Sequence, residues 1–271
     1  MLLLMESVIL GLVNKNFRFL RKMGEVFQSA GQIVPFVFAI GSYDVGFEPN
    51  SVITKTYRST FADIYYVPNW LLCFPQNYNK DFRTPFANDR NSYLVHKFSS
   101  ITLITLDSGF LIGQDDKYQL RFLERQLIAA QSGLIIVQYS MSLYPSCITS
   151  EYTYDYKRGQ EKWGRLFEKY NVKVVFENGC RYFKRTKPLK NDLVDPANGV
   201  IYAGDGNFGS NSNFGCDTSK INQGLFEKTG NWNHYWTLAF SKNSQNATDG
   251  YNFTAYDLDN SVIDDFQLKL E

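Results

Sequence analysis

The spacing of apolar residues divides the chain into helices and strands that alternate as far as residue 182. Apolar positions three and four apart predict helices over 15–30, 115–131 and 159–170. Gly31 follows the first of these helices as a stop signal. Continuous apolar runs bounded by turn residues predict buried strands over 34–40, 100–106, 134–139 and 172–176. Beyond residue 182 the pattern predicts strands alone, over 200–203, 235–240 and 250–258.

Two of the predicted helices carry an apolar stripe that a core would cover. In helix 115–131 the stripe consists of Tyr118, Leu120, Phe122, Leu123, Leu127 and Ile128. In helix 159–170 it consists of Trp163, Leu166, Phe167 and Tyr170. Residues 45–92 are rich in proline and asparagine and predict an irregular excursion. Alternating helices and strands, followed by strands alone, predict an α/β fold in layers with packed sheets.

Length and charge limit the class of protein. A chain of 271 residues with 44% hydrophobic residues can bury a sizeable core, and its formal net charge of +1 gives no indication of nucleic-acid binding. No apolar run is long enough to predict a membrane span. The first 13 residues are apolar but interrupted by Glu6, so they make a poor signal peptide.

Four cysteines and two glycosylation triplets are the other compositional signals. The cysteines are Cys73, Cys147, Cys180 and Cys216; none forms a C-x-x-C pair, and their three pairings as disulfides stay open. Asn246 and Asn252 each begin an N-x-T triplet, the acceptor pattern for N-linked glycans. These triplets matter only if the chain enters the secretory pathway.

Polar loops follow the predicted strands, and ligands of α/β proteins bind at such carboxyl ends. The loops read Gly41-Ser42-Tyr43-Asp44, Asp107-Ser108-Gly109, Ser140-Met141-Ser142-Leu143-Tyr144 and Asn178-Gly179-Cys180-Arg181. Further blocks are Asn69-Trp70 before Phe74-Pro75, Gln119-Leu120 before Glu124, Leu166–Val172, Arg185–Pro188 and Val200–Tyr202 before Gly204. In this order they resemble the motif blocks of the calcineurin-like metallophosphoesterases, most closely the purple (tartrate-resistant) acid phosphatases.

The resemblance implies a layered metallophosphoesterase-like β-sandwich flanked by helices, in a single domain over residues 1–271. The family's opening strand and loop, which supply a bridging aspartate, are missing before residue 15, so the resemblance also implies a fold truncated at the N-terminus. The family binds two metal ions, iron with zinc, manganese or a second iron, and hydrolyses phosphate monoesters. It further implies a secreted or endomembrane setting.

The chain departs from this family at the residues that carry the chemistry. The catalytic and metal-binding positions of the family fall on Ser42, Tyr43, Asp44, Ser140, Gly179 and Arg181. Ser42 replaces an asparagine ligand, and Tyr43 replaces a catalytic histidine. Asp44 keeps the family's aspartate. Histidine ligands are replaced at Ser140, Gly179 and Arg181. Arg181 would put a fixed positive charge where a dication binds. We therefore expect no catalytic residue and no metal cofactor in this chain.

Two other kinds of site are open to these loops. Arg181, Lys184 and Arg185 are candidates to bind an anion such as phosphate, and a solvated basic loop is the competing interpretation. Asp44, Asp107 and Asp205 could hold a single hard cation weakly. We favour the interpretation that these aspartates cap turns.

Two hypotheses about function follow. The first is a catalytically inactive phosphatase-like domain with a binding, structural or regulatory role, whose partner is a phosphate-containing ligand or a protein. The alternative is an acid phosphatase with a remnant metal site, or one whose N-terminus is incomplete. Metal-dependent phosphatase turnover discriminates between them, because only the alternative predicts it.

Overall fold

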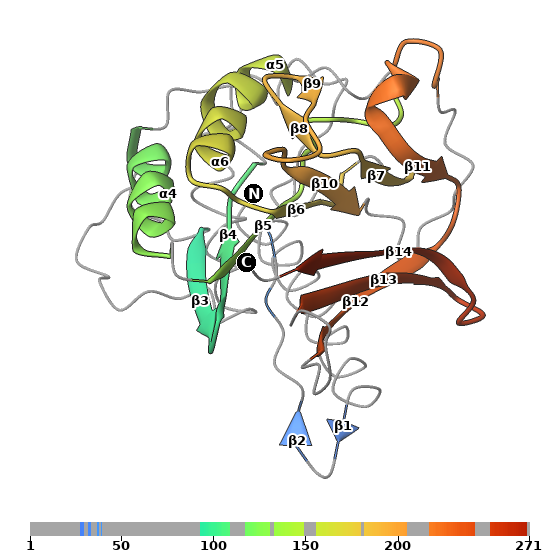
Figure 1. Ribbon diagram of the computed structural model, residues 1–271, viewed down its shortest axis with the longest axis horizontal. Helices are drawn as coiled ribbons and strands as arrows, with labels where there is room; N and C mark the ends of the chain where they lie inside the picture. Colours follow the sequence, from blue (N-terminus) through green and yellow to red (C-terminus); the bar gives the residue numbers. More distant parts are fainter. Residues whose placement is uncertain are drawn as a thin grey trace, which may run out of the picture.

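The computed structural model describes residues 93–108, 117–130, 133–148, 156–179, 182–204, 217–241 and 250–269, with short pieces at 28–29, 32–33, 37 and 39. These residues form a mixed α/β structure dominated by sheets, as the sequence predicts. A seven-stranded sheet is covered by helices on one face and by a three-stranded sheet on the other (Figure 1).

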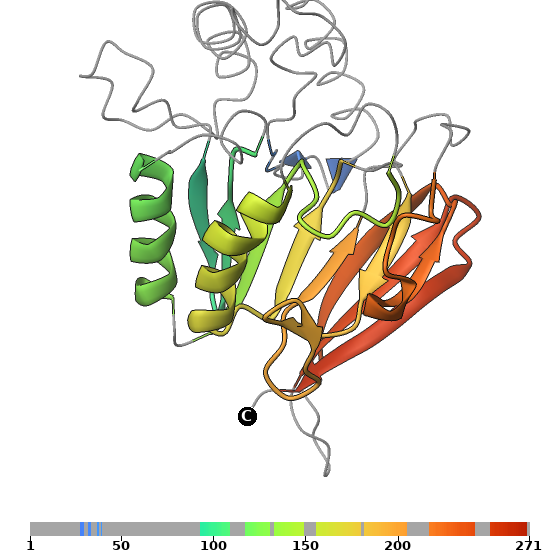
Figure 2. The same cartoon turned by 90° about the horizontal axis from the view of Figure 1, so that it is seen from above.

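The seven-stranded sheet has the order β11-β7-β10-β6-β5-β4-β3. Its strands are β3 (Leu94–Phe98), β4 (Ile101–Thr105), β5 (Leu134–Tyr139), β6 (Val174–Glu177), β7 (Phe183–Thr186), β10 (Ile201–Gly204) and β11 (Phe226–Gly230). The central strands β4, β5, β6 and β10 are parallel, while β3, β7 and β11 pair antiparallel. The parallel strands run toward one edge of the sheet (Figure 2). The loops that follow them therefore lie at that edge.

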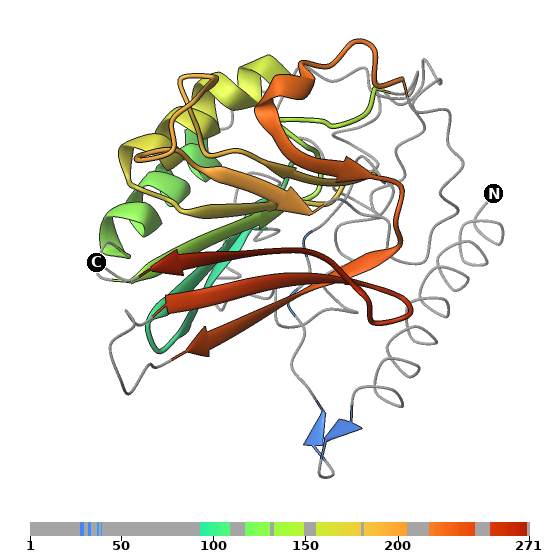
Figure 3. The same ribbon diagram turned by 45° about the vertical axis from the view of Figure 1, so that its right-hand side comes forward.

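The second sheet consists of β12 (His234–Ser241), β13 (Gly250–Asp257) and β14 (Val262–Lys269), all antiparallel with β13 in the centre. It faces the side of the large sheet opposite the helices (Figure 3). Two short hairpins complete the described strands. They are β1 (Gln28–Ser29) with β2 (Gln32–Ile33), and β8 (Leu189–Lys190) with β9 (Leu193–Val194).

Two helical segments cover the outer face of the large sheet. One is α4 (Lys117–Ala129). The other is continuous from α5 (Tyr156–Gly159) through a π-helical turn, η5 (Gln160–Gly164), into α6 (Arg165–Lys169). A 3₁₀ turn, η6 (Gln223–Leu225), precedes β11. The predicted helices 115–131 and 159–170 are confirmed over these residues.

Strand β5 shows why the sheet forms where it does. Its odd-numbered residues, Ile135, Val137 and Tyr139, pack under the helices with Leu123 and Phe167. Its even-numbered residues, Leu134 and Ile136, pack against Tyr251 and Phe253 of β13. A strand buried on both faces has no polar side to expose, and this explains the continuous apolar run in the sequence.

Three sequence predictions differ from the structure. The helix predicted over 15–30 is wrong at its end, because Gln28 and Ser29 pair as a strand across Gly31; residues 15–27 lie outside the described part. Val37 and Ala39 are not in a strand, although one was predicted over 34–40. Ile128 is 56% exposed instead of facing the core, since it lies at the edge of the helix stripe. Strands β3, β7, β11 and β14 were not predicted.

Candidate functional site

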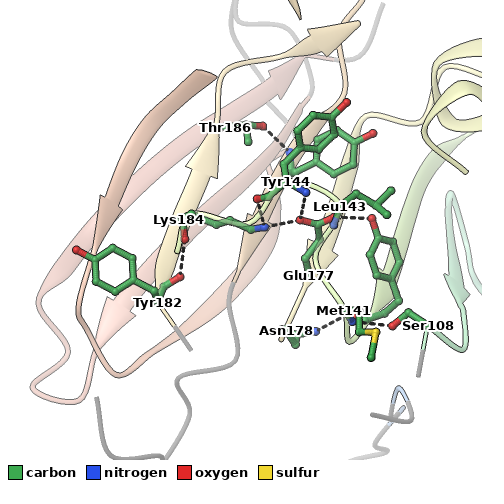
Figure 4. A network of polar contacts seen from close by, with 12 residues as sticks. Ser108, Met141, Leu143, Tyr144, Glu177, Asn178, Tyr182, Lys184 and Thr186 are labelled. Carbon is green, nitrogen blue, oxygen red and sulfur yellow. Dashed lines mark hydrogen bonds and ion pairs between the residues drawn. The ribbon is translucent and has the colours of Figure 1, made fainter. Parts of the chain in front are cut away.

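The loops after β4, β5 and β6 meet at the carboxyl edge of the sheet and are hydrogen-bonded to one another. The backbone N–H of Met141 donates to the hydroxyl oxygen of Ser108 over 2.6 Å. The backbone N–H of Asn178 donates to the carbonyl oxygens of Tyr139 and Ser140, at 3.2 and 3.0 Å. Figure 4 shows Ser108, Met141 and Asn178 together at this edge. Three of the four loops in which the sequence places the candidate site thus lie side by side in the structure, and their function stays a prediction.

Asp107, in the loop after β4, is held by a glutamine of α4. The side-chain oxygen of Gln119 accepts from the backbone N–H of Asp107 over 2.8 Å, and its nitrogen donates to the carbonyl oxygen of Asp107 over 3.0 Å. Both residues are buried. The side chain of Gln119 thus replaces a strand partner at the point where the ladder ends, which fixes the course of the loop.

Glu177, the last residue of β6, is the centre of the polar network in Figure 4. One carboxylate oxygen accepts from the hydroxyl of Tyr139 over 2.6 Å and from the backbone N–H of Leu143 over 2.7 Å. The other oxygen accepts from the backbone N–H of Tyr144 over 3.4 Å. The carboxylate is therefore what holds the loop after β5 against β6.

Lys184 of β7 neutralises this carboxylate. Its ammonium group forms an ion pair with Glu177 and also donates to the carbonyl oxygen of Tyr144 over 2.6 Å (Figure 4). Neither side chain has any exposed surface. A buried charge is tolerated only when it is paired and its remaining hydrogen-bonding capacity is satisfied, and this pair meets both conditions.

Tyr139 donates its hydroxyl proton to this network and remains neutral. Burial, together with the adjacent negative charge of Glu177, raises the pKa of Tyr139 well above its usual value. Burial likewise raises the pKa of Tyr144, whose hydroxyl donates to Asp192 over 2.6 Å. These phenols are therefore fixed donors that position a loop, and neither is prepared to act as a base.

Gly179 lies where the resemblance expects a histidine ligand, and the structure has no room for a side chain there. A Cβ atom added at this position would lie 2.6 Å from the carbonyl oxygen of Ser140 and 3.2 Å from the Cα atom of Met141. Both contacts are with backbone, which cannot rotate away as a side chain would. Positions 140 and 179 are thus packed against each other through their backbones.

Adding that Cβ atom gives a direct test of this packing. We expect Gly179→Ala to lower the free energy of unfolding by about 1–3 kcal/mol, because the backbone of the loop after β5 must shift. Gly164→Ala is the matched control. Its Cβ would meet only the hydroxyl of Tyr202, at 3.7 Å, and it lies in a helix, where alanine is preferred. Urea unfolding of both variants measures the change in the free energy of unfolding. Equal stability of Gly179→Ala and wild type would contradict the close packing.

The predicted site residues are described only in part. Ser42, Tyr43, Asp44, Arg181 and Asp205 lie outside the described residues. Ser140 and Gly179 lie together at the strand ends, and Ser140 is half-buried. Asp107 is 3% exposed and Asn178 is exposed at the same edge. The structure therefore brings together three of the four predicted loops.

Two of the predicted anion-binding residues are engaged elsewhere. Lys184 is buried and paired with Glu177. Arg185 points to the other sheet, where its Nε and Nη2 atoms donate to the carboxylate of Asp264 over 2.6 and 2.9 Å. Alternate residues of a strand face opposite sides, so the run Lys184-Arg185 cannot form one basic surface. These ion pairs do not support the anion site predicted from the sequence.

Glu177 is the residue that sequence reasoning missed. A signal was present, because a carboxylate directly after the apolar run Val174–Phe176 needs a partner if the strand is buried. Lys184, which follows the core residue Phe183 and precedes the buried Thr186 by two positions, is the corresponding cation. The sequence does not show that the two residues pair, because they lie on different strands, β6 and β7, joined by a loop.

Among the described residues, no group of three or more His, Cys, Asp or Glu side chains could hold a metal ion. In the same part of the chain, no helix is both long and apolar enough to cross a membrane. Cys147 is disulfide-bonded, and the other three cysteines lie outside the described residues.

Comparison with solved structures assigns the fold. The chain is similar to a purple acid phosphatase from seeds of yellow lupin (Lupinus luteus), with a TM-score of 0.56 and 18% sequence identity. The match covers 69% of this chain and 34% of the lupin chain, so it spans about a third of that protein. The fold is therefore metallophosphoesterase-like, as the sequence resemblance predicts.

A second similar structure is GAP50, described as the anchor in the inner membrane complex of Plasmodium. Its TM-score is 0.45 at 16% identity, and the match covers 66% of this chain and 53% of that one. No protein-family model matches the chain. No curated protein sequence matches it either.

The likeness to a purple acid phosphatase corrects one expectation. The replaced ligand positions predict no metal cofactor, whereas the fold shared with the lupin enzyme implies metal ions. The expectation rested largely on Ser42, Tyr43 and Arg181, which lie outside the described residues. The described residues do not fit a metal centre by themselves, because Glu177 is paired with Lys184 and position 179 has no room for a ligand. We therefore derive no catalytic step through a metal.

Proposed function

We propose that this chain is a pseudophosphatase, a domain with the purple acid phosphatase fold that does not hydrolyse phosphate monoesters and serves as a binding or structural element. The observation that carries the proposal is the packing at Gly179. A histidine at this position, as the family resemblance expects, would require its Cβ atom within 2.6 Å of the carbonyl oxygen of Ser140. Backbone atoms therefore occupy the space that a histidine ligand at position 179 would need, and this supports a domain without phosphatase activity.

The Glu177–Lys184 pair supports the same proposal. It ties the loop after β5 to β6 and β7 through four hydrogen-bonding partners of the carboxylate, Tyr139, Leu143, Tyr144 and Lys184. In active sites, strongly shifted pKa values commonly mark the residues that act as acids and bases. Here two of the groups with strongly raised pKa values are the buried Tyr139 and Tyr144, whose hydroxyls donate hydrogen bonds to Glu177 and Asp192. The network is consistent with a rigid scaffold.

The alternative function is a metal-dependent acid phosphatase. The likeness to the lupin purple acid phosphatase favours it, because the two chains share a fold. In that case the metal ligands would come from outside the described residues, since the described ones do not supply a centre. A likeness at 18% identity does not carry activity from one protein to another, because function depends on the site.

We also propose a secreted or endomembrane setting. Cys147 is disulfide-bonded, and disulfides form and persist in oxidising compartments. The fold of a purple acid phosphatase agrees with this setting. The proposed partner, a protein or a phosphate-containing ligand, would bind the domain in that compartment.

Steady-state hydrolysis of p-nitrophenyl phosphate by the purified chain tests the proposal. The protein is incubated with iron, zinc and manganese salts and assayed before and after addition of a chelator. We expect no turnover above that of the heat-denatured protein. Asp107→Asn is the matched control, because it alters the strand-end loop and would change any activity that belongs to the chain. Chelator-sensitive turnover that this variant reduces would favour the phosphatase alternative.

A further inference from the structure

Asn252 lies on the outer face of the three-stranded sheet. It belongs to β13, the central strand, in which Tyr251, Phe253 and Ala255 are buried and Asn252 and Thr254 are half-buried. Side chains alternate between the two faces of a strand, so Asn252 and Thr254 share the side turned away from the large sheet. No described helix or strand covers this side (Figure 3).

The residues around Asn252 leave space above it. Ala239 of β12 and Gln267 of β14 pair directly with it, and both are exposed. The side chain of Ala239 is a single methyl group, so no large side chain stands beside Asn252 on the β12 side. The fold does not use the Asn252 side chain in any hydrogen bond between described residues. A bulky group on its amide nitrogen would extend into solvent without disturbing the core.

We propose that Asn252 carries an N-linked glycan. Asn252-Phe253-Thr254 is an acceptor triplet whose half-buried asparagine and threonine share the face turned away from the large sheet. In the reaction the amide nitrogen of Asn252 forms a bond to C1 of the first sugar and loses a proton. The bond that breaks joins C1 to the diphosphate of a lipid-linked oligosaccharide, which is the donor, and the lipid diphosphate leaves.

The disulfide of Cys147 is independent support for this modification. Lipid-linked donors are used in the secretory pathway, the same oxidising environment in which a disulfide persists. The transfer occurs on the growing chain, so folding must afterwards place the glycan outside the core. Asn252 satisfies that condition, because the opposite face of β13 carries the packing with Leu134, Ile136 and Val174. The inference does not depend on whether the domain hydrolyses phosphate esters.

Translation of the full chain, fused to a cleavable secretion leader, into microsomes tests the inference. The Asn246→Gln background leaves Asn252 as the acceptor of the remaining N-x-T triplet. We expect one glycan that peptide-N-glycosidase removes, and none after Asn252→Gln or Thr254→Val. Thr254→Ser, which keeps the hydroxyl of the triplet, restores the glycan.

A relocated triplet distinguishes the surface from the sequence motif. Ala239→Asn, added to the variant that lacks both natural acceptors, creates a triplet with Ser241 on the neighbouring strand of the same face. We expect one glycan again, and resistance to trypsin equal to that of the unglycosylated protein. Absence of a glycan in the Asn246→Gln background would overturn the inference.

Discussion

Replacing Lys184 by methionine is expected to lower the free energy of unfolding by about 3–5 kcal/mol. Methionine fills the volume of the lysine stem, but it leaves the carboxylate of Glu177 buried without its counter-charge. The donors that remain, the hydroxyl of Tyr139 and the backbone N–H groups of Leu143 and Tyr144, are neutral. Urea unfolding, followed by tryptophan fluorescence and far-UV circular dichroism, measures the change.

Two controls separate charge pairing from general damage. Lys187→Met makes the same substitution where the ammonium group donates to Gly224 over 3.1 Å at an exposed position, and we expect a change within about 0.5 kcal/mol. Glu177→Gln combined with Lys184→Met removes both charges and keeps an acceptor for Tyr139. We expect the double variant to be more stable than Lys184→Met, with a coupling of about 0.5–3 kcal/mol. Strict additivity of the two substitutions would contradict a buried ion pair.

Cys147→Ser is expected to lower the free energy of unfolding by about 2–5 kcal/mol. The residue is disulfide-bonded and 1% exposed, so its loss both releases a cross-link in the unfolded chain and leaves a buried hydroxyl. The bond ties down the loop after β5, which also carries the backbone groups bound to Glu177. Guanidinium unfolding under oxidising conditions measures the effect.

Reduction of the wild-type protein is the matched control for that variant. Non-reducing peptide mass spectrometry should join the Cys147 peptide to a second cysteine peptide, and a thiol reductant should bring the wild-type stability close to that of Cys147→Ser. A free thiol at Cys147 in protein purified without reductant, with unchanged stability of the variant, would contradict the disulfide.

The parallel core of the fold could be predicted because its strands are apolar on both faces. Apolar residues are mostly buried in strands β4, β5 and β6 and in helix α4. The local pattern of these segments therefore agrees with the tertiary structure. Strands β7 and β14 could not be predicted in this way. Each presents a charged residue to the interior, Lys184 in one and Asp264 in the other. Lys184 pairs with Glu177 on another strand, and Asp264 pairs with Arg185, 79 positions away, and local pattern cannot show either pairing.

The positions of the strand-end loops could be predicted, and their function stays a prediction. The loops after β4, β5 and β6 could be placed at one edge of the sheet, since polar residues after buried parallel strands fall there. No role in the site was predicted for Glu177, and Lys184 was predicted to bind an anion or to lie in a solvated basic loop. The structure pairs them, because each has a fully buried side chain, Glu177 at the end of β6 and Lys184 on β7, which β10 separates in the sheet. The close approach of Gly179 to Ser140 depends on strand register, which no motif encodes.

The measurement that tests the account most directly is hydrolysis of a phosphate monoester under stoichiometric conditions, followed by phosphorus NMR. Equimolar full-length protein and substrate, with iron, zinc and manganese supplied in turn, would reveal even a single hydrolysis per chain. The account predicts that the monoester signal persists with each metal at the rate of the protein-free solution. Conversion to inorganic phosphate that depends on the metal, stops on chelation and requires the intact fold would contradict it.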